Sequence, residues 1–160
     1  MQFLDGKAIV ITGAGSGLGA AYARHCAALG ARLVVNDVDA AAAERIAAEI
    51  AAAGGMAIAS AGSVALWDYA GRLIETCVTA FGRIDGLLNN AGILRHGRLT
   101  EMTEQDLRAM LEVNTIGTAA CASHAIRRML EQDGPCSIVN VASGSQAGDI
   151  ALGGYASTKG

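Results

Sequence analysis

At Thr12–Gly19 the chain has the stretch TGAGSGLG, which lies between a short β-branched run (residues 7–12) and an alanine-rich helical pattern (residues 18–29). Glycines in such a turn let the backbone bend sharply and let a pyrophosphate approach without a Cβ in the way. The first turn of the following helix offers unpaired N–H donors and a partial positive charge to an anion. The stretch therefore predicts a strand–turn–helix unit that binds a dinucleotide.

Apolar runs of strand length alternate with longer helical patterns along the rest of the chain. In five runs the apolar residues are continuous rather than alternating, as in strands buried on both faces of a parallel sheet: residues 7–12, 31–36, 56–60, 84–89 and 137–141. Helical patterns occur at residues 18–29, 39–53, 65–81, from Thr103 onward, and at 115–132. The fourth begins with Thr-x-x-Asp (Thr103, Asp106), which is close to a capping box. Such alternation gives right-handed βαβ units. We therefore expect an α/β fold, a Rossmann-like doubly wound parallel sheet of five strands forming one domain over residues 1–160.

The composition narrows the class of protein. The 160 residues are 52% hydrophobic and 17% charged, which supports a packed core, and the net charge of −3 argues against a nucleic-acid or anionic-membrane surface. No apolar run approaches the roughly 20 residues of a membrane-spanning helix, and the N-terminus lacks the pattern of a secretory signal. The four cysteines and three histidines are scattered, without metal-site spacing. We expect a cytoplasmic protein without a metal site.

An acidic residue follows the second predicted strand. Asp37 comes after Gly19 at close to the roughly 20-residue spacing at which a carboxylate meets the adenosine ribose hydroxyls. Its charge would repel a 2′-phosphate, and no Arg or Lys follows it closely. The sequence therefore favours NAD(H) over NADP(H). The alternative is that Asp37 only caps the next helix, a role that Asp39 could also take.

Three further polar features follow later strands. Asn89–Gly92 (NNAG) closes the fourth strand, Ser143 lies just past the fifth, and Tyr155–Lys159 (YASTK) contains a Tyr-x-x-x-Lys whose two side chains would share a helix face. Taken singly, each has a plain structural explanation: a polar turn, a loop serine and a chance pair. Their joint occurrence in one order along the chain carries the functional prediction.

The full set of motifs, in chain order, is Thr-Gly-x-x-x-Gly-x-Gly at 12–19, Asp37, Asn-Asn-Ala-Gly at 89–92, Asn114, Ser143 and Tyr-x-x-x-Lys at 155–159. In this order they resemble the short-chain dehydrogenase/reductase family, and the resemblance covers nearly all of the chain. The glycine spacing is similar to that of the branch that reduces ketones and oxidises alcohols. The resemblance implies NAD(H)-dependent interconversion of a small secondary alcohol and a ketone by hydride transfer.

The resemblance also implies a role for each motif residue. Tyr155 would be the general acid/base that exchanges a proton with the substrate oxygen, Ser143 would position that oxygen, and Lys159 would hold the nicotinamide ribose and favour ionisation of the phenol. Asn114 would anchor a water molecule of a proton relay. A free phenol ionises at about pH 10, so a base that works near neutral pH needs adjacent positive charge. The implied cofactor-binding residues are Gly13, Ser16, Gly17, Leu18, Gly19, Asp37, Ser63, Val64, Asn90, Ala91, Gly92, Tyr155 and Lys159.

Two features depart from the family pattern. Ser63-Val64 occupies the place where the family commonly has an Asp near the adenine amino group, which predicts altered adenine recognition. The sequence stops at Gly160, whereas family members continue through the rest of the Tyr–Lys helix and two more strands. We therefore expect a C-terminally truncated fold whose fifth strand is a sheet edge and in which Tyr155 and Lys159 lie on a frayed single turn.

These departures leave two functional hypotheses open. In the first, the chain is an alcohol/ketone oxidoreductase; in the second, it is a non-catalytic dinucleotide-binding fragment that keeps the phosphate loop, Asp37 and Asn90. Full-length family members form homo-oligomers through two long helices, of which residues 104–132 would supply one. Arg95 and His96 either face substrate or are exposed loop residues.

Overall fold

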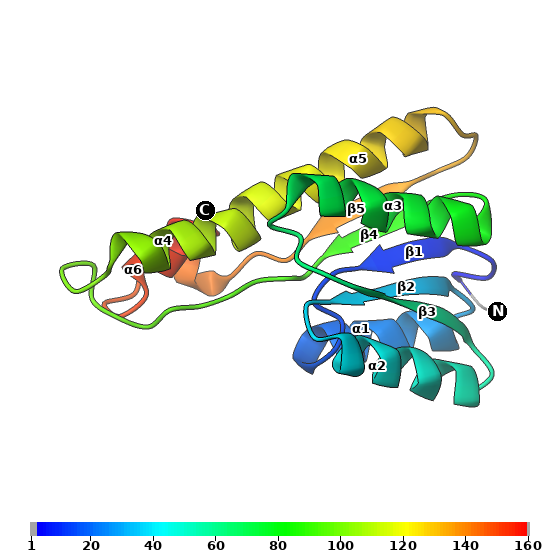
Figure 1. Ribbon diagram of the computed structural model, residues 1–160, viewed down its shortest axis with the longest axis horizontal. Coiled ribbons are helices and arrows are strands. Elements are labelled where there is room, and N and C mark those ends of the chain that lie inside the picture. Colours follow the sequence, from blue (N-terminus) through cyan, green and yellow to red (C-terminus); the bar gives the residue numbers. More distant parts are fainter. Residues whose placement is uncertain (1–2, 160) are drawn as a thin grey trace.

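The computed structural model describes residues 3–159 and contains a five-stranded parallel sheet with helices on both faces (Figure 1). The strands are β1 (Ala8–Ile11), β2 (Arg32–Asp37), β3 (Met56–Ala61), β4 (Gly86–Asn89) and β5 (Ser137–Asn140). They lie in the order β3-β2-β1-β4-β5, and every neighbouring pair is parallel. The predicted Rossmann-like sheet is confirmed. The strand order reverses at β1, which places the glycine-rich turn at the switch point where such sheets bind ligands.

Helices cover both faces of the sheet. α1 (Gly17–Ala28) and α2 (Ala40–Ala52) pack on one face, and α3 (Trp67–Phe81) and α5 (Thr118–Leu130) pack on the other (Figure 1). Successive strand residues point to opposite faces, so Leu33 and Val35 join the core under α1 and α2 while Val34 joins the core under α3 and α5. Both cores need apolar residues from β2, which explains why Leu33, Val34 and Val35 are apolar in succession.

The helices predicted from Thr103 onward and over residues 115–132 form one continuous helix. α4 (Glu104–Met110) begins at Thr103, whose hydroxyl accepts a hydrogen bond from the Asp106 amide at 3.1 Å, as the capping pattern predicts. A π-helical segment, η1 (Leu111–Gly117), then joins α4 directly to α5, with helical backbone angles at both junctions (Figure 1). Segments of this kind are frequent at functional sites, and Asn114 lies in this one.

The C-terminal part of the described chain extends beyond the sheet. A short 3-10 helix, η2 (Gly144–Ala147), follows β5, and the single-turn α6 (Gly153–Ala156) packs beside α4 (Figure 1). Within residues 3–159, β5 pairs only with β4, and Val139 is 54% exposed. The prediction that the fifth strand is a sheet edge is confirmed. None of the helices described within residues 3–159 combines the length and the apolar character needed to cross a bilayer.

Asp85 ties together the amino ends of β1 and β4, opposite the glycine-rich turn. Its side chain is 3% exposed, and the carboxylate accepts hydrogen bonds from the Ala8 amide at 2.9 Å, Lys7 Nζ at 3.2 Å and Arg83 Nε at 3.0 Å. Burial by itself raises the pKa of this carboxyl, but the hydrogen bonds from Arg83, Ala8 and Lys7 outweigh it and leave the pKa below its ordinary value. Asp85 therefore stabilises the folded chain in its ionised form.

Candidate functional site

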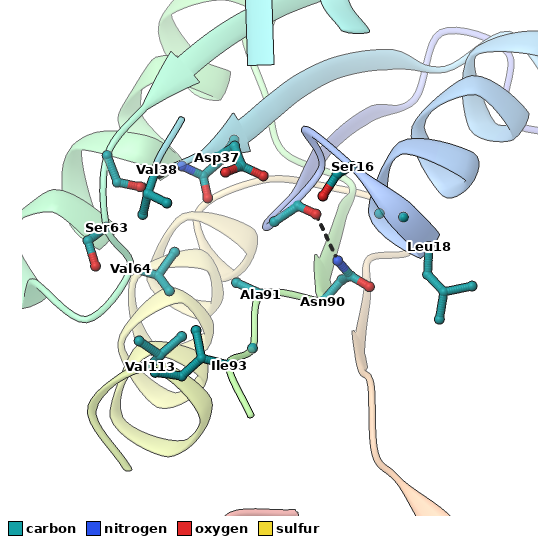
Figure 2. Close-up of a pocket in the computed structure, with 16 residues that line it drawn as sticks. Ser16, Leu18, Asp37, Val38, Ser63, Val64, Asn90, Ala91, Ile93 and Val113 are labelled. Carbon is teal, nitrogen blue, oxygen red and sulfur yellow. Dashed lines mark hydrogen bonds between the residues drawn. The ribbon is translucent and has the colours of Figure 1, made fainter. Parts of the chain in front are cut away.

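A pocket of about 410 Å³ opens at the carboxyl ends of β1, β2 and β4 (Figure 2). All the predicted cofactor-binding residues except Tyr155 and Lys159 line it, namely Gly13, Ser16, Gly17, Leu18, Gly19, Asp37, Ser63, Val64, Asn90, Ala91 and Gly92. Five further lining residues were missed by the sequence analysis: Asn36, Val38, Gly62, Ile93 and Val113. Each is a sequence neighbour of a predicted site residue, and that adjacency was the available signal.

Thr12 and Asn90 lock the glycine-rich loop to the end of β4. Thr12 Oγ1 accepts from the backbone amides of Asn90 at 3.1 Å and Ala91 at 3.0 Å. In return, Asn90 Nδ2 donates to the carbonyls of Thr12 and Gly13, both at 3.0 Å; the bond to Gly13 is drawn in Figure 2. The Asn90 amide therefore shapes the loop as well as lining the pocket. Thr12 itself was not among the predicted site residues, because its contacts join positions far apart in the sequence.

The loop requires glycine at Gly13 and Gly19 for packing reasons. Gly13 has a φ of +61°, and a Cβ on it would lie 2.8 Å from Ala91 Cα. A Cβ on Gly19 would overlap the carbonyl oxygen of Gly13 and lie 2.6 Å from Asn90 Nδ2. Ser16, the N-cap residue of α1, makes no side-chain capping bond. The amides of the first turn of α1 are therefore free to bind an anion in the pocket.

Asp37 is fixed at the other end of the pocket. Its Oδ2 accepts from the Gly15 amide at 2.9 Å, and its Oδ1 accepts from the Asp39 amide at 3.1 Å. Asp39 caps α2 by accepting from the Ala42 amide at 3.1 Å, so the capping role belongs to Asp39. Asp37 lines the pocket beside Val38 (Figure 2), and its carboxylate oxygens retain lone pairs for further donors.

Ser63 and Val64 form a separate part of the pocket wall. Ser63 Oγ accepts from the Ala65 amide at 3.3 Å, so this hydroxyl takes part in a local turn. Val64 is buried and packs on η1, where a Cβ on Gly117 would lie 2.8 Å from Val64 Cγ2. The prediction of altered adenine recognition at Ser63 stays a prediction.

Asn114 connects three segments that are distant in sequence. Its Oδ1 accepts from the Ile93 amide at 2.8 Å, and its Nδ2 donates to the Ile93 carbonyl at 2.9 Å and to Thr158 Oγ1 at 2.9 Å. Its backbone carbonyl accepts from Thr118 Oγ1 at 2.8 Å. Asn114 thereby joins the loop after β4, the π-helical segment and the turn after α6. The water-anchoring role implied by the resemblance stays a prediction.

Lys159 and Tyr155 lie on a short but well-anchored turn. Thr158 is held by Asn114, and Lys159 Nζ donates to the Val141 carbonyl at 2.9 Å. The structure therefore shows a formed turn where a frayed one was expected, and these two long-range bonds hold it. Lys159 Nζ lies 6.0 Å from the centroid of the Tyr155 ring, as the shared helix face predicts. Burial lowers the pKa of Lys159.

Gly92 connects the two halves of the site. It lines the 410 Å³ pocket, and a Cβ on it would lie 3.3 Å from Asn114 Oδ1 and 3.5 Å from Lys159 Nζ. Ser143 is less closely integrated: its Oγ accepts from the Ser145 amide at 3.2 Å and so caps η2. Among residues 3–159 no hydrogen bond joins Ser143 to Tyr155, so the structure brings together Asn114, Lys159 and the pocket, but does not bond Ser143 directly to Tyr155.

Comparison with known proteins identifies the family. The fold and the glycine-rich turn at its switch point define a Rossmann-like α/β protein, and the family model described as short chain dehydrogenase matches residues 7–160. The chain belongs to the short-chain dehydrogenase family.

The chain is similar to several longer members of the family. It is 39% identical to a 3-oxoacyl-[acyl-carrier-protein] reductase from Synechocystis (89% of this chain, 58% of the relative) and 44% identical to the peroxisomal multifunctional enzyme type 2 of Drosophila melanogaster (81% and 23%). A solved short chain dehydrogenase/reductase from Burkholderia phymatum, in complex with NAD, aligns with a TM-score of 0.95 at 36% identity, over 98% of this chain and 56% of that one. The chain thus spans little more than half the length of these relatives, or less.

Proposed function

We propose that the chain is the dinucleotide-binding and proton-transfer part of an NAD(H)-dependent oxidoreductase that interconverts a small secondary alcohol and a ketone. One observation carries the proposal: the predicted loop glycines, Asp37 and Asn90 line a single pocket at the switch point of the sheet. The related structure from Burkholderia phymatum contains NAD, and a relative is named as a reductase of a 3-oxoacyl group; both support this chemistry.

The described residues support a binding mode for the dinucleotide. The free amides at the start of α1 would bind the pyrophosphate, and the Asp37 carboxylate would accept hydrogen bonds from the ribose hydroxyls. Asp37 disfavours a second negative charge at this position, so we propose NAD(H) as the preferred form. Replacing Asp37 with Ala should raise NADP⁺ affinity relative to NAD⁺ affinity in calorimetric titrations, and an unchanged ratio would remove this assignment.

Asn114 and Lys159 adjoin this pocket at Gly92. A bound nicotinamide dinucleotide supplies the hydride. Tyr155 would exchange a proton at its phenolic oxygen with the substrate oxygen, and Ser143 would donate a hydrogen bond that orients that oxygen. Lys159 Nζ, 6.0 Å from the Tyr155 ring centroid, would place a positive charge beside the phenol. Asn114 would keep the Ile93 loop and the Lys159 turn in register with the pocket.

Steady-state reduction of a panel of small ketones with NADH, measured beside NADH binding, tests the proposal. Tyr155→Phe should lower turnover at least ~100-fold while NADH affinity stays within about twofold, because only the proton donor is lost. Tyr22→Phe, which removes a phenolic hydroxyl on α1, is the matched control and should leave turnover unchanged. Equal turnover of the wild type and Tyr155→Phe would contradict the acid/base role.

A second candidate function is dinucleotide binding without catalysis. It is favoured by one observation: the cofactor pocket is fully lined, whereas the Ser143 hydroxyl is engaged in capping η2. NADH binding with no turnover on any ketone of the panel would support this candidate. Absence of binding to either dinucleotide would overturn both.

A further inference from the structure

Arg45, on the second turn of α2, is bonded to the glycine-rich loop although it does not itself line the pocket. Its Nη2 donates to the carbonyl of Gly15 at 2.8 Å, and its Nη1 donates to Glu49 Oε1 at 2.8 Å. The side chain is 52% exposed, so it is not confined to this position by packing. Arg45 and Gly15 are 30 residues apart in the sequence, so only the folded chain brings the guanidinium to the glycine-rich loop.

Asp37 and Arg45 both bind the backbone of Gly15. The Gly15 amide donates to Asp37 Oδ2 at 2.9 Å, while the Gly15 carbonyl accepts from Arg45. The packing here is tight, since a Cβ on Gly15 would lie 2.8 Å both from Asp37 Oδ2 and from the Ala42 Cβ of α2. The guanidinium therefore lies one backbone residue away from the carboxylate that is proposed to bind the adenosine ribose.

The positive charge of Arg45 is only partly compensated by its acidic neighbour Glu49. Glu49 Oε2 also accepts from Arg24 on α1, at 3.0 Å from Nε and 2.6 Å from Nη2. One carboxylate is thus shared by two guanidinium groups, so this cluster of Arg24, Arg45 and Glu49 carries a net positive charge. Of the two arginines, Arg45 is the one bonded to the glycine-rich loop.

We propose that Arg45 is a specificity-determining residue for the 2′ position of the adenosine ribose, opposing Asp37 by binding a 2′-phosphate when the dinucleotide carries one. The inference rests on the proposed function, since it concerns the same pocket. Asp37 favours a free 2′-hydroxyl by hydrogen bonding and repels a phosphate there. A guanidinium binds phosphate through paired, charge-assisted hydrogen bonds, for which Arg45 would exchange its single bond to the Gly15 carbonyl.

Calorimetric titration of NAD⁺ and NADP⁺ into a set of paired variants tests this role. The reference is Asp37→Ala, and Asp37→Ala/Arg45→Met should bind NADP⁺ at least ~10-fold more weakly than the reference, the effect of one charge-assisted bond. NAD⁺ affinity should stay within about twofold. The double variant Asp37→Ala/Arg45→Lys should retain most of the NADP⁺ affinity of Asp37→Ala, because an ammonium also binds phosphate.

Arg24→Met is the matched control in the same background. Arg24 binds the same Glu49 but makes no hydrogen bond to Gly15. Its loss should leave the NADP⁺ affinity of Asp37→Ala unchanged, and an effect as large as that of Arg45→Met would overturn the proposal in favour of general positive charge. Equal weakening of NAD⁺ and NADP⁺ by Arg45→Met would also overturn it, since Arg45 would then act only by holding Gly15. If the wild-type chain binds neither dinucleotide, the proposed function is overturned together with this inference. If the chain binds NAD⁺ but Arg45→Met leaves the NADP⁺ affinity of Asp37→Ala unchanged, this inference alone is overturned.

Discussion

The two halves of the site differ in how they are held. The pocket half is made where β1, β2 and β4 end, and its loops are bonded to one another through Thr12, Asn90 and Asp37. The half that carries Tyr155 and Lys159 depends on a four-residue turn, α6, and on a few long-range bonds to Asn114 and Val141. The first half is part of the sheet, and the second is attached to it.

This difference has a consequence for function. Local opening is favoured where few buried contacts hold a segment, so the turn that carries Tyr155 should open without unfolding the sheet. Dinucleotide binding and proton transfer should therefore respond to different substitutions.

The strongest test of the pocket half is Gly19→Ala compared with Gly17→Ala. A Cβ at Gly19 would overlap the Gly13 carbonyl oxygen, so the loop must shift, and we expect NAD⁺ affinity to fall at least ~100-fold and the free energy of unfolding to fall by about 3 kcal/mol. Gly17 has a φ of +51° with no atom within 4 Å of its added Cβ, so Gly17→Ala should cost only about 1 kcal/mol of backbone strain. Similar affinities for the two variants in calorimetry would contradict the packing argument.

Asp85→Ala should weaken the sheet beneath both halves. It leaves the buried Ala8 amide without its acceptor and removes the partner of Lys7 and Arg83, so we expect the free energy of unfolding in urea to fall by about 3 kcal/mol. Hydrogen exchange should accelerate in both halves together. Glu44→Ala, at an exposed carboxylate of α2, is the control and should change stability by less than about 0.5 kcal/mol.

The same carboxylate predicts a pH dependence. Because the pKa of Asp85 is lower in the folded chain than in the unfolded chain, its contribution is fully present above about pH 4 and is lost as the pH falls through the folded-state pKa. Urea titrations at falling pH should show the wild type losing more stability than Asp85→Ala. Parallel curves for the two proteins would show that Asp85 does not act through its charge.

The fold and the pocket were largely predictable from sequence because they rest on local signals. The apolar runs fixed the strands within two residues at their ends, and the glycine-rich turn located the pocket, since a strand–turn–helix unit keeps sequence neighbours together. The Asp39 and Thr103 caps followed for the same reason.

The remaining features depend on contacts between distant positions. Thr12 is hydrogen-bonded to the amide of Asn90, and Arg45 to the carbonyl of Gly15. Hydrophobic periodicity carries no information on such long-range hydrogen bonds. The π-helical form of η1 accompanies the bonds of Asn114 to Ile93 and Thr158, which belong to other segments. The α6 turn was expected to fray because helix nucleation was considered alone, without the Lys159–Val141 bond.

Thr12→Val should affect the pocket half selectively and less severely. Valine has the same shape but cannot accept from the amides of Asn90 and Ala91, so we expect a loss of about 1–2 kcal/mol in stability and roughly 10-fold in NAD⁺ affinity. Thr12→Ser keeps the acceptor and should retain most of both quantities. Hydrogen exchange at α6 should not change in either variant, and acceleration there would contradict the separation of the two halves.

The smallest expected effect on global stability is that of Thr158→Val, which tests the other half. Thr158 Oγ1 accepts from Asn114 Nδ2 and donates to the Tyr155 carbonyl at 2.8 Å, so valine should release the α6 turn, while Asn114 Nδ2 keeps its bond to Ile93. We expect less than about 1 kcal/mol loss of global stability, with faster hydrogen exchange confined to the segment around Tyr155. If the chain turns over ketones, the rate should fall by roughly 10-fold at unchanged NADH affinity, and Thr158→Ser should restore it. Because Gly92 joins the halves beside Asn114 and Lys159, a fall in NADH affinity as large as that caused by Thr12→Val would mean that the turn is part of the pocket and not an attachment to it.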